Sequence, residues 1–283
     1  MSLTIAKTPG EVKAVIREWK KEGLSIGLVP TMGYLHEGHG SLIKKAVSEN
    51  DRVMVSVFVN PIQFGPNEDL ESYPRDFEAD VKLIESLGAD LVFHPEPSDM
   101  YEKDFSTTIS VSGVSENLCG ARRPGHFNGV CTVVTKLFNL SEADRAYFGQ
   151  KDAQQLAVVK RMVRDLNANI EIVGCPIIRE EDGLAKSSRN TYLSADERKA
   201  AVVLSKALKA GKEMIESGEK DASKVKAKIS SVIDAEPLAK TDYVEICDWN
   251  LIEPVDIINN SVLVAIAVYI GKTRLIDNFI IEK

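Results

Sequence analysis

At 283 residues the chain exceeds the roughly 100 to 200 residues that usually build one core, so two domains are expected. A content of 44% hydrophobic and 27% charged residues is typical of globular proteins and argues against disorder. The net charge of −7 disfavours nucleic acid and anionic membrane as partners, because the field of the molecule repels polyanions.

The cysteines and the apolar segments indicate the cellular compartment of the protein. Four cysteines, at positions 119, 131, 175 and 247, form no CxxC pair and no zinc spacing, so we interpret them as reduced packing residues. The first residues have no apolar signal core, and the longest apolar run, Val262–Ile270, is shorter than the ~20 residues of a membrane helix. We therefore expect a cytoplasmic protein.

The first predicted element is a helix. Thr8 is suited to the N-cap, Pro9 to the first helical position, and Glu11 completes a capping box. Apolar residues then recur at helical spacing from Val12, and Gly23 is placed to end the helix.

Strands and helices alternate after this helix. Strands are expected at residues 25–29, 53–59, 90–94, 146–148 and 171–178, and helices at 36–50, 76–87, 132–140 and 152–166. The alternation predicts an α/β domain over residues 1–182, with a parallel sheet wrapped by helices. From residue 183, helices at 194–216 and 222–234 and strands near 242–249, 262–270 and 273–281 predict a smaller α+β domain over 183–283.

Two histidines directly follow the first strand of that sheet. His36 and His39, in PTMGYLHEGHGSLI, lie on one face of a helical turn. Ligands of open α/β sheets bind at the carboxyl ends of strands, and a helix N-terminus attracts phosphate. The imidazoles can donate hydrogen bonds to charge that builds at phosphorus, and Gly33 and Gly38 let the backbone come close. The alternatives are two surface histidines or a pair of zinc ligands, but the two histidines lack the i, i+4 spacing of H-E-x-x-H.

Two further segments carry charge suited to phosphate. In YFGQKDAQQ, residues 147–155, Lys151 can neutralise phosphate and Asp152 can hold Mg²⁺ through water. In GLAKSSRN, residues 183–190, two hydroxyls, a lysine and an arginine suit the β and γ phosphates at a domain junction that can move. A solvated helix start and a plain polar linker are the respective alternatives.

Candidate substrate residues lie in two other segments. Asn60 and Gln63 follow the second strand, where amides can grip a small polar substrate, and a Gly/Pro-bearing loop that could act as a lid comes next. Arg123 and His126, in RRPGHFNGV, could bind a carboxylate, and an exposed structural turn is the equal alternative.

Taken together, these five segments resemble the pantothenate synthetase (pantoate–β-alanine ligase) family of the HxGH nucleotidylyltransferase superfamily, over nearly the whole chain. The resemblance implies a Rossmann-like ATP domain, a smaller C-terminal α+β lid domain, a homodimer and a need for Mg²⁺. It also implies the reaction. Pantoate carboxylate attacks the α-phosphorus of ATP and releases pyrophosphate, and the amine of β-alanine then converts the pantoyl adenylate to pantothenate, a coenzyme A precursor, and AMP.

The resemblance further implies the roles of individual residues. His39 takes the position of the proton donor, with His36 as its partner and Lys151 as the third catalytic residue. Pantoate would be bound by Gln63 and Gln155, with Gln63 also near β-alanine, and Asn60, Arg123 and His126 would be further pocket residues. The implied ATP-binding residues are Met32, Gly33, Tyr34, Leu35, His36, Glu37, Gly38, His39, Gly149, Gln150, Lys151, Asp152, Ile178, Lys186, Ser187, Ser188 and Arg189.

The chain also departs from the family pattern at four positions. Gly40 stands where a large apolar residue is usual, which is expected to loosen its helix. Lys186 replaces a common Met or Leu, Gln150 a common Glu, and Ala143 a usual Pro. A relative of class I aminoacyl-tRNA synthetases and a non-catalytic nucleotide sensor are the competing hypotheses, but the acidic charge and the intact histidines disfavour them.

Overall fold

The computed structural model describes residues 3–66 and 68–283, which form two compact units. The first unit contains the chain up to Val111, with Arg123–Gln150 and Val158–Pro176. The second contains Ile177–Lys283 together with two earlier segments, Ser112–Arg122 and Lys151–Ala157. The division into functional domains after residue 182 remains a prediction.

The first unit is built on a parallel sheet of six strands. The strands are β1 (Thr4–Ala6), β2 (Ile26–Thr31), β3 (Arg52–Val57), β4 (Leu91–Phe93), β5 (Arg145–Gly149) and β6 (Glu171–Cys175). They lie in the order β1-β4-β3-β2-β5-β6, and every pair is parallel. This sheet confirms the expected Rossmann-like α/β class.

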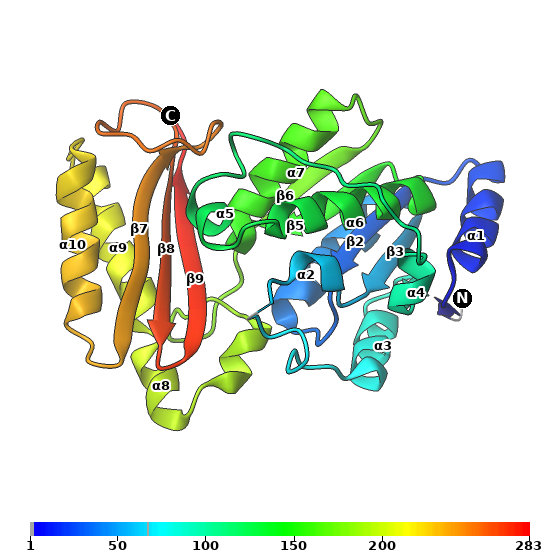
Figure 1. Ribbon diagram of the computed structural model, residues 1–283, viewed down its shortest axis with the longest axis horizontal. Coiled ribbons are helices and arrows are strands. Elements are labelled where there is room, and N and C mark those ends of the chain that lie inside the picture. Colours follow the sequence, from blue (N-terminus) through cyan, green and yellow to red (C-terminus); the bar gives the residue numbers. More distant parts are fainter. Residues whose placement is uncertain (1–2, 67) are drawn as a thin grey trace. The chain divides into compact units, whose positions relative to one another are not determined.

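Helices cover both faces of this sheet (Figure 1). They are α1 (Pro9–Lys21), α2 (Glu37–Glu49), α3 (Phe77–Ser86), α4 (Pro97–Met100), α6 (His126–Ser141) and α7 (Ala153–Asp165), with short 3₁₀ turns η1 (Pro61–Gln63) and η2 (Gln150–Asp152). The chain winds from β2 to β3 and β4 in one direction, and from β5 to β6 in the other. Right-handed crossovers therefore place α2 and α3 on one face and α1, α6 and α7 on the opposite face. On the first face Ile43 and Ile84 pack against the strand residues Val55 and Val92.

The second unit contains an antiparallel sheet of three strands. Its elements are α5 (Leu118–Arg122), η3 (Ser188–Tyr192), α8 (Ala195–Ala200), α9 (Val203–Glu216), α10 (Ala222–Asp234), β7 (Ala239–Asp248), β8 (Val262–Ile270) and β9 (Thr273–Ile281). The order is β7-β8-β9. Leu204 of α9 and Ile229 of α10 share a core with Val264 and Ile266 of β8, so both helices lie on one face of the sheet (Figure 1). The smaller α+β domain is thereby confirmed.

Several boundaries differ from those expected. Strand β1 was not predicted because it has only three residues and takes its place at the sheet edge by pairing with β4. Strand β6 ends at Cys175, since the following Pro176 has no N–H for the ladder. The single helix expected over 194–216 is two helices, because the hydrogen bonds tighten to i→i−3 at Val202 and Leu204.

The cysteines and the helices can be compared with the expectations drawn from composition. All four cysteines are free thiols, and Cys131, Cys175 and Cys247 are buried, as packing residues should be. Within residues 3–66 and 68–283, no helix combines the length and the apolarity needed to cross a bilayer.

Candidate active site

Strands β2 and β5 are neighbours in the centre of the sheet, and the chain leaves them in opposite directions. The crevice at such a switch point is where open α/β sheets bind ligands. The loop Met32–His36 follows β2, and Gly149 ends β5 with Gln150 directly after it. Two of the segments with predicted ATP-binding residues therefore meet the same crevice. The alternation of strands and helices does not predict that β2 and β5 are neighbours, because more than a hundred residues separate them along the chain.

The two predicted catalytic histidines form one unit at the start of α2. The Nδ1 atom of His36 accepts the N–H of Gly38 at 3.1 Å, and the N–H of His36 donates to Nδ1 of His39 at 3.3 Å. Their ring centroids are 4.1 Å apart. Both bonds need a lone pair on Nδ1, so each neutral ring carries its hydrogen on Nε2. The pair thus has two N–H donors of defined position at a helix N-terminus, where a phosphate is favoured.

A buried carboxylate holds the loop that precedes these histidines. Asp80 of α3 is 3% exposed and accepts the N–H of Tyr34 at 2.8 Å and of Leu35 at 2.6 Å. Burial raises the pKa of Asp80 above its usual value, and the two backbone donors oppose this effect. Gly33 has φ 84°, and a Cβ there would lie 2.9 Å from both Asp80 Oδ2 and Val57 Cγ1. The loop therefore needs glycine at this position and an acceptor beneath it.

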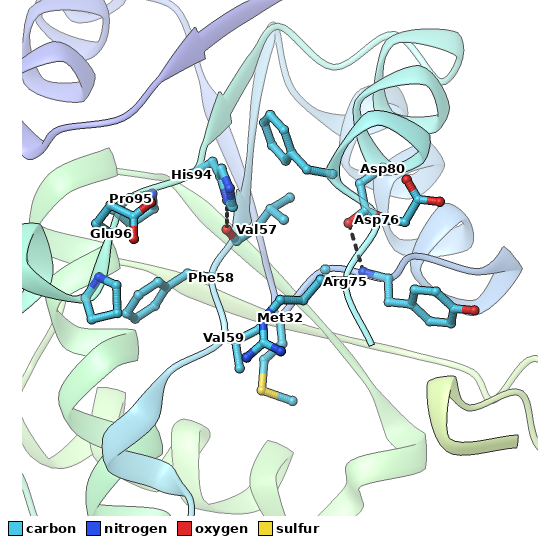
Figure 2. A pocket seen from close by; sticks show the side chains of 14 residues that line it. Met32, Val57, Phe58, Val59, Arg75, Asp76, Asp80, His94, Pro95 and Glu96 are labelled. Atoms are coloured by element: carbon cyan, nitrogen blue, oxygen red, sulfur yellow. Dashed lines mark hydrogen bonds between the residues drawn. The ribbon is translucent and has the colours of Figure 1, made fainter. Parts of the chain in front are cut away.

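A cavity of about 310 Å³ opens beside this loop, at the carboxyl ends of β2, β3 and β4. Figure 2 shows Asp80, Arg75 and His94 among its lining residues, together with the bond between His94 and Val57. Nδ1 of His94 lies 2.7 Å from the carbonyl oxygen of Val57 and so carries its hydrogen there. The His94 ring stacks on Phe77 at 4.0 Å. No role was predicted for His94, and these contacts explain its place as a wall of the cavity.

Asn60 and Gln63 belong to one hydrogen-bonded network after β3. Asn60 is 1% exposed, and its Nδ2 donates to Oε1 of Gln63 at 3.0 Å and to the carbonyl of Gly129 at 3.2 Å. The other end of the Gln63 amide, Nε2, donates to Sδ of Met32 at 3.1 Å. A predicted substrate residue is thus in direct contact with the predicted ATP loop.

The predicted residues Arg123 and His126 support this network from the side of α6. Nδ1 of His126 lies 2.8 Å from the carbonyl oxygen of Gln63, and its Nε2 lies 3.0 Å from Nη1 of Arg123. Arg123 forms two bonds of 2.6 Å with the carboxylate of Glu68. Burial alone would raise the pKa of Glu68, but the bonds and charge of Arg123 outweigh it and hold the pKa below its usual value. A substrate carboxylate would therefore have to replace Glu68 to reach the fork of Arg123.

The residues that follow Gln150, Lys151–Ala157, belong to the second unit and include the start of α7. Nζ of Lys151 lies 3.9 Å from Asp152, and the Lys151 carbonyl accepts Nδ2 of Asn278 at 2.9 Å. Gln154 is buried, and its amide bonds Val114, Asn117 and Cys119. Gln155 is only partly buried. Of the two adjacent glutamines, Gln154 therefore has a structural role, and the predicted binding residue Gln155 is the more accessible.

The remaining predicted ATP residues lie on a hairpin of the same unit. The N–H of Lys186 donates to the carbonyl of Ile178 at 2.9 Å, so two positions far apart in the motif are paired. Nζ of Lys186 lies 3.2 Å from Glu180. Ser187 caps η3 by accepting the N–H of Arg189, and Ser188 is buried within that turn. The basic groups of this hairpin are thus held on a compact turn, as a phosphate site requires.

Strand β9 anchors both segments of the second unit. Arg179, next to Ile178, forms bonds of 2.7 and 2.9 Å with Asp277, while the neighbouring Asn278 holds Lys151. Sequence reasoning missed Asp80, Glu68, Asp277 and Asn278. A sign of Asp80 was present, because it recurs with Ile84 at helical spacing on the buried side of α3, where a charge is exceptional.

Within residues 3–66 and 68–283, protein side chains alone form no metal site. In the part of the chain that the structure describes, no group of three or more His, Cys, Asp or Glu side chains could hold a metal ion. Asp152, the predicted ligand, lies beside Lys151. Mg²⁺ commonly uses one or two carboxylates together with substrate phosphates and water, and a single carboxylate fits that mode.

Comparison with known proteins gives one family. Residues 4–280 match the family model described as pantoate-beta-alanine ligase. Pantothenate synthetase of Clostridium acetobutylicum is 62% identical over 277 residues, which cover 98% of this chain and 99% of the relative.

Solved structures agree with that result. A pantothenate synthetase from Thermus thermophilus is similar with a TM-score of 0.93 and 44% identity, over 98% of this chain and 99% of its own. A pantoate-beta-alanine ligase from Francisella tularensis, complexed with beta-gamma ATP and beta-alanine, has a TM-score of 0.80 and 36% identity, over 98% and 97%.

Proposed function

Because the chain belongs to the pantoate-beta-alanine ligase family and is therefore a ligase, we propose that it joins pantoate to β-alanine at the expense of ATP. The observation that carries this proposal is the pair of imidazole Nε2–H donors at the N-terminus of α2, beside the switch point of the sheet. A relation to aminoacyl-tRNA synthetases has no comparable support.

The first step is the adenylation of pantoate. The pantoate carboxylate attacks the α-phosphorus of ATP, and the bond to pyrophosphate breaks. The Nε2–H groups of His36 and His39 stabilise the charge that builds on the phosphoryl oxygens, and His39 donates its Nε2 proton to the leaving pyrophosphate. Lys151, Lys186 and Arg189 balance phosphate charge, and Ser187 and Ser188 add donors. Nζ of Lys186 lies 3.2 Å from the carboxylate of Glu180, so a phosphate would have to displace Glu180 to bind Lys186.

The second step is the transfer of the pantoyl group. The β-alanine amine attacks the acyl carbon of the adenylate, AMP leaves, and pantothenate forms. Gln63 and Gln155 hold pantoate through their amides, and Asn60, Arg123 and His126 shape the pocket around Gln63. No side chain is acylated, because the nucleophile of each step comes from a substrate.

Magnesium, the dimer and the location complete the proposal. Asp152 would hold Mg²⁺ beside the phosphates, and the ion would supply charge neutralisation there. We further propose a homodimer working in the cytoplasm, with residues 1–182 as the ATP and pantoate domain and residues 183–283 as its lid. The sequence resemblance supports these points.

Pyrophosphate exchange tests the proposal. Labelled pyrophosphate should enter ATP when pantoate and Mg²⁺ are present and β-alanine is omitted, because the first step is reversible while the adenylate stays bound. AMP and pantothenate should appear only after β-alanine is added. Exchange that required β-alanine would contradict the two-step order, and a lack of both reactions would reject the function.

A further inference from the structure

The carbonyl of Gly129 determines how the amide of Asn60 is oriented. A carbonyl oxygen only accepts hydrogen bonds, so the Asn60 atom 3.2 Å away must be the donor Nδ2. The opposite end of the Asn60 amide is then Oδ1, which lies 2.6 Å from the hydroxyl of Tyr101. Tyr101 must therefore donate to Asn60.

The same reasoning extends to Gln63. The second hydrogen of Asn60 Nδ2 points to a Gln63 atom at 3.0 Å, and that atom must be the acceptor Oε1. The Nε2 group of Gln63 consequently lies at the other end of the amide, where it contacts Sδ of Met32 at 3.1 Å. A thioether is a weak acceptor, so these N–H groups remain available to a stronger one.

Tyr101 is itself held in place and keeps its proton. Its ring lies 5.0 Å from that of Phe105 and 6.3 Å from that of Phe58, and its backbone N–H closes the turn of α4 on Pro97. Burial raises the pKa of Tyr101, so the hydroxyl stays a donor throughout the neutral range.

We propose that Tyr101 is a positioning residue: through Asn60 it makes Gln63 present N–H groups, so that this point of the pocket takes a hydrogen-bond-accepting oxygen, such as that of a carboxylate or a hydroxyl. The proposal rests on the proposed contact between Gln63 and pantoate. The Gly129 carbonyl selects the orientation of Asn60, and the Tyr101 hydroxyl holds Asn60 in it, so that Gln63 keeps its N–H groups towards the pocket.

The test is a double-mutant cycle read by pantoate-dependent pyrophosphate exchange. Tyr101→Phe leaves the buried Oδ1 of Asn60 without its donor, and we expect the KM for pantoate to rise about 5- to 30-fold while the KM for ATP stays within about twofold. In the Gln63→Ala background the same change should alter the KM for pantoate by less than about twofold, because the residue through which Tyr101 acts is gone.

Tyr147→Phe is the matched control. It also removes a tyrosine hydroxyl bonded to an asparagine amide in the same unit, at 2.7 Å from Asn50, and it should leave the KM for pantoate unchanged. Should Tyr101→Phe fail to fold, Asn60→Asp tests the same point, because it replaces the donor facing Gln63 by an acceptor and should raise the KM for pantoate.

Each outcome has one meaning. A KM for pantoate within twofold of wild type in Tyr101→Phe, or in Asn60→Asp where that variant is used, overturns the positioning role. An effect of Tyr101→Phe that persists fully without Gln63 overturns the route through Gln63. A wild-type protein that shows no pantoate-dependent exchange rejects the proposed function instead.

Discussion

Each imidazole of the His36–His39 pair uses its Nδ1 for a structural bond, and we propose Nε2 as the atom that meets the ligand. Nδ1 of His39 accepts a backbone N–H, and this bond belongs to the capping of α2. The chemistry we propose uses Nε2 instead. A substitution that keeps the acceptor and removes only the donor can therefore separate the two roles.

His39→Asn is that substitution, because the asparagine Oδ1 can take the place of Nδ1 while nothing replaces Nε2–H. We expect adenylation to fall about 10² to 10⁴-fold with little change in urea stability. His39→Ala should lose the same activity and, in addition, part of the stability of the cap. Adenylation within threefold of wild type in folded His39→Asn would remove His39 from the chemistry.

Asp80 has two carboxylate oxygens for two backbone donors, and an asparagine has only one. Asp80→Asn should therefore leave one N–H of the loop facing an NH₂ group, at a cost of about 1 to 3 kcal/mol. We expect the KM for ATP to rise about 5- to 100-fold, with a much smaller change for pantoate. Asp76→Asn in the same helix keeps its cap on Ala79 and is the control. Equal ATP use by both variants would contradict the role of Asp80.

At the scale of elements, two glycines occupy the fourth position of a helix near the site, and their surroundings are opposite. A Cβ on Gly40 of α2 would meet Leu87 at an ordinary 3.5 Å. A Cβ on Gly129 of α6 would lie 2.5 Å from both Ile62 O and Gln63 Cα. The departure at Gly40 thus weakens α2 without serving a close contact, whereas Gly129 lets η1 approach α6.

Gly40→Ala should consequently raise the free energy of unfolding by about 0.5 to 1 kcal/mol, because alanine costs less conformational entropy in a helix. Gly129→Ala should lower it by about 1 to 3 kcal/mol through overpacking and should also displace Gln63. Urea unfolding measures both changes. If the free energy of unfolding changed in the same direction and by a similar amount in both variants, the close backbone contact would not be the reason for a glycine at position 129.

The loop before α3 is tied to the start of α6 by Glu68 and Arg123. Since the pKa of Glu68 is lowered in the folded state, the pair stabilises the protein above the unfolded pKa of about 4.3, and this contribution is lost as pH falls through the folded pKa. Glu68→Gln should be less stable than wild type by roughly 1 kcal/mol at pH 7. The two proteins should converge once the pH has fallen below the lowered, folded-state pKa of Glu68.

Glu71→Gln is the control for this pH dependence, because Glu71 is an exposed residue of the same loop. It should match wild type across the whole range in urea unfolding. A difference between Glu68→Gln and wild type that stays constant as the pH falls from 7 into the acid-unfolding range would show that the ion pair with Arg123 does not stabilise the loop.

At the scale of the whole molecule, the predicted ATP residues are distributed over two compact units. Lys186–Arg189 and Lys151 belong to the second unit, and the HxGH segment belongs to the first. If ATP binds both, the distance between the units should respond to it. Spin labels at Lys21 and Lys209, whose side chains are 64% and 79% exposed, should report a shift with ATP and Mg²⁺ but not with AMP. An unchanged distance would end the lid hypothesis.

The amino-acid sequence by itself determined the features that depend on neighbours along the chain. Thr8 caps α1 with Glu11 as expected, and His36 caps α2 after a short loop that follows a buried strand. The α/β class and the smaller α+β part were also predicted correctly, because hydrophobic periodicity reports which face of each element is buried. These are local rules, so one chain suffices to apply them.

Only the tertiary structure decided which distant groups meet. It places β5 beside β2, Asp80 beneath a loop 46 positions earlier, and Glu68 on Arg123 across 55 positions. It also pairs Asn60 with Gly129 across 69 positions and brings Tyr101 to Asn60. Such contacts follow from strand order and from the packing of whole elements against each other. No spacing rule along the chain describes them, and for that reason the residues that position the candidate site were not predicted.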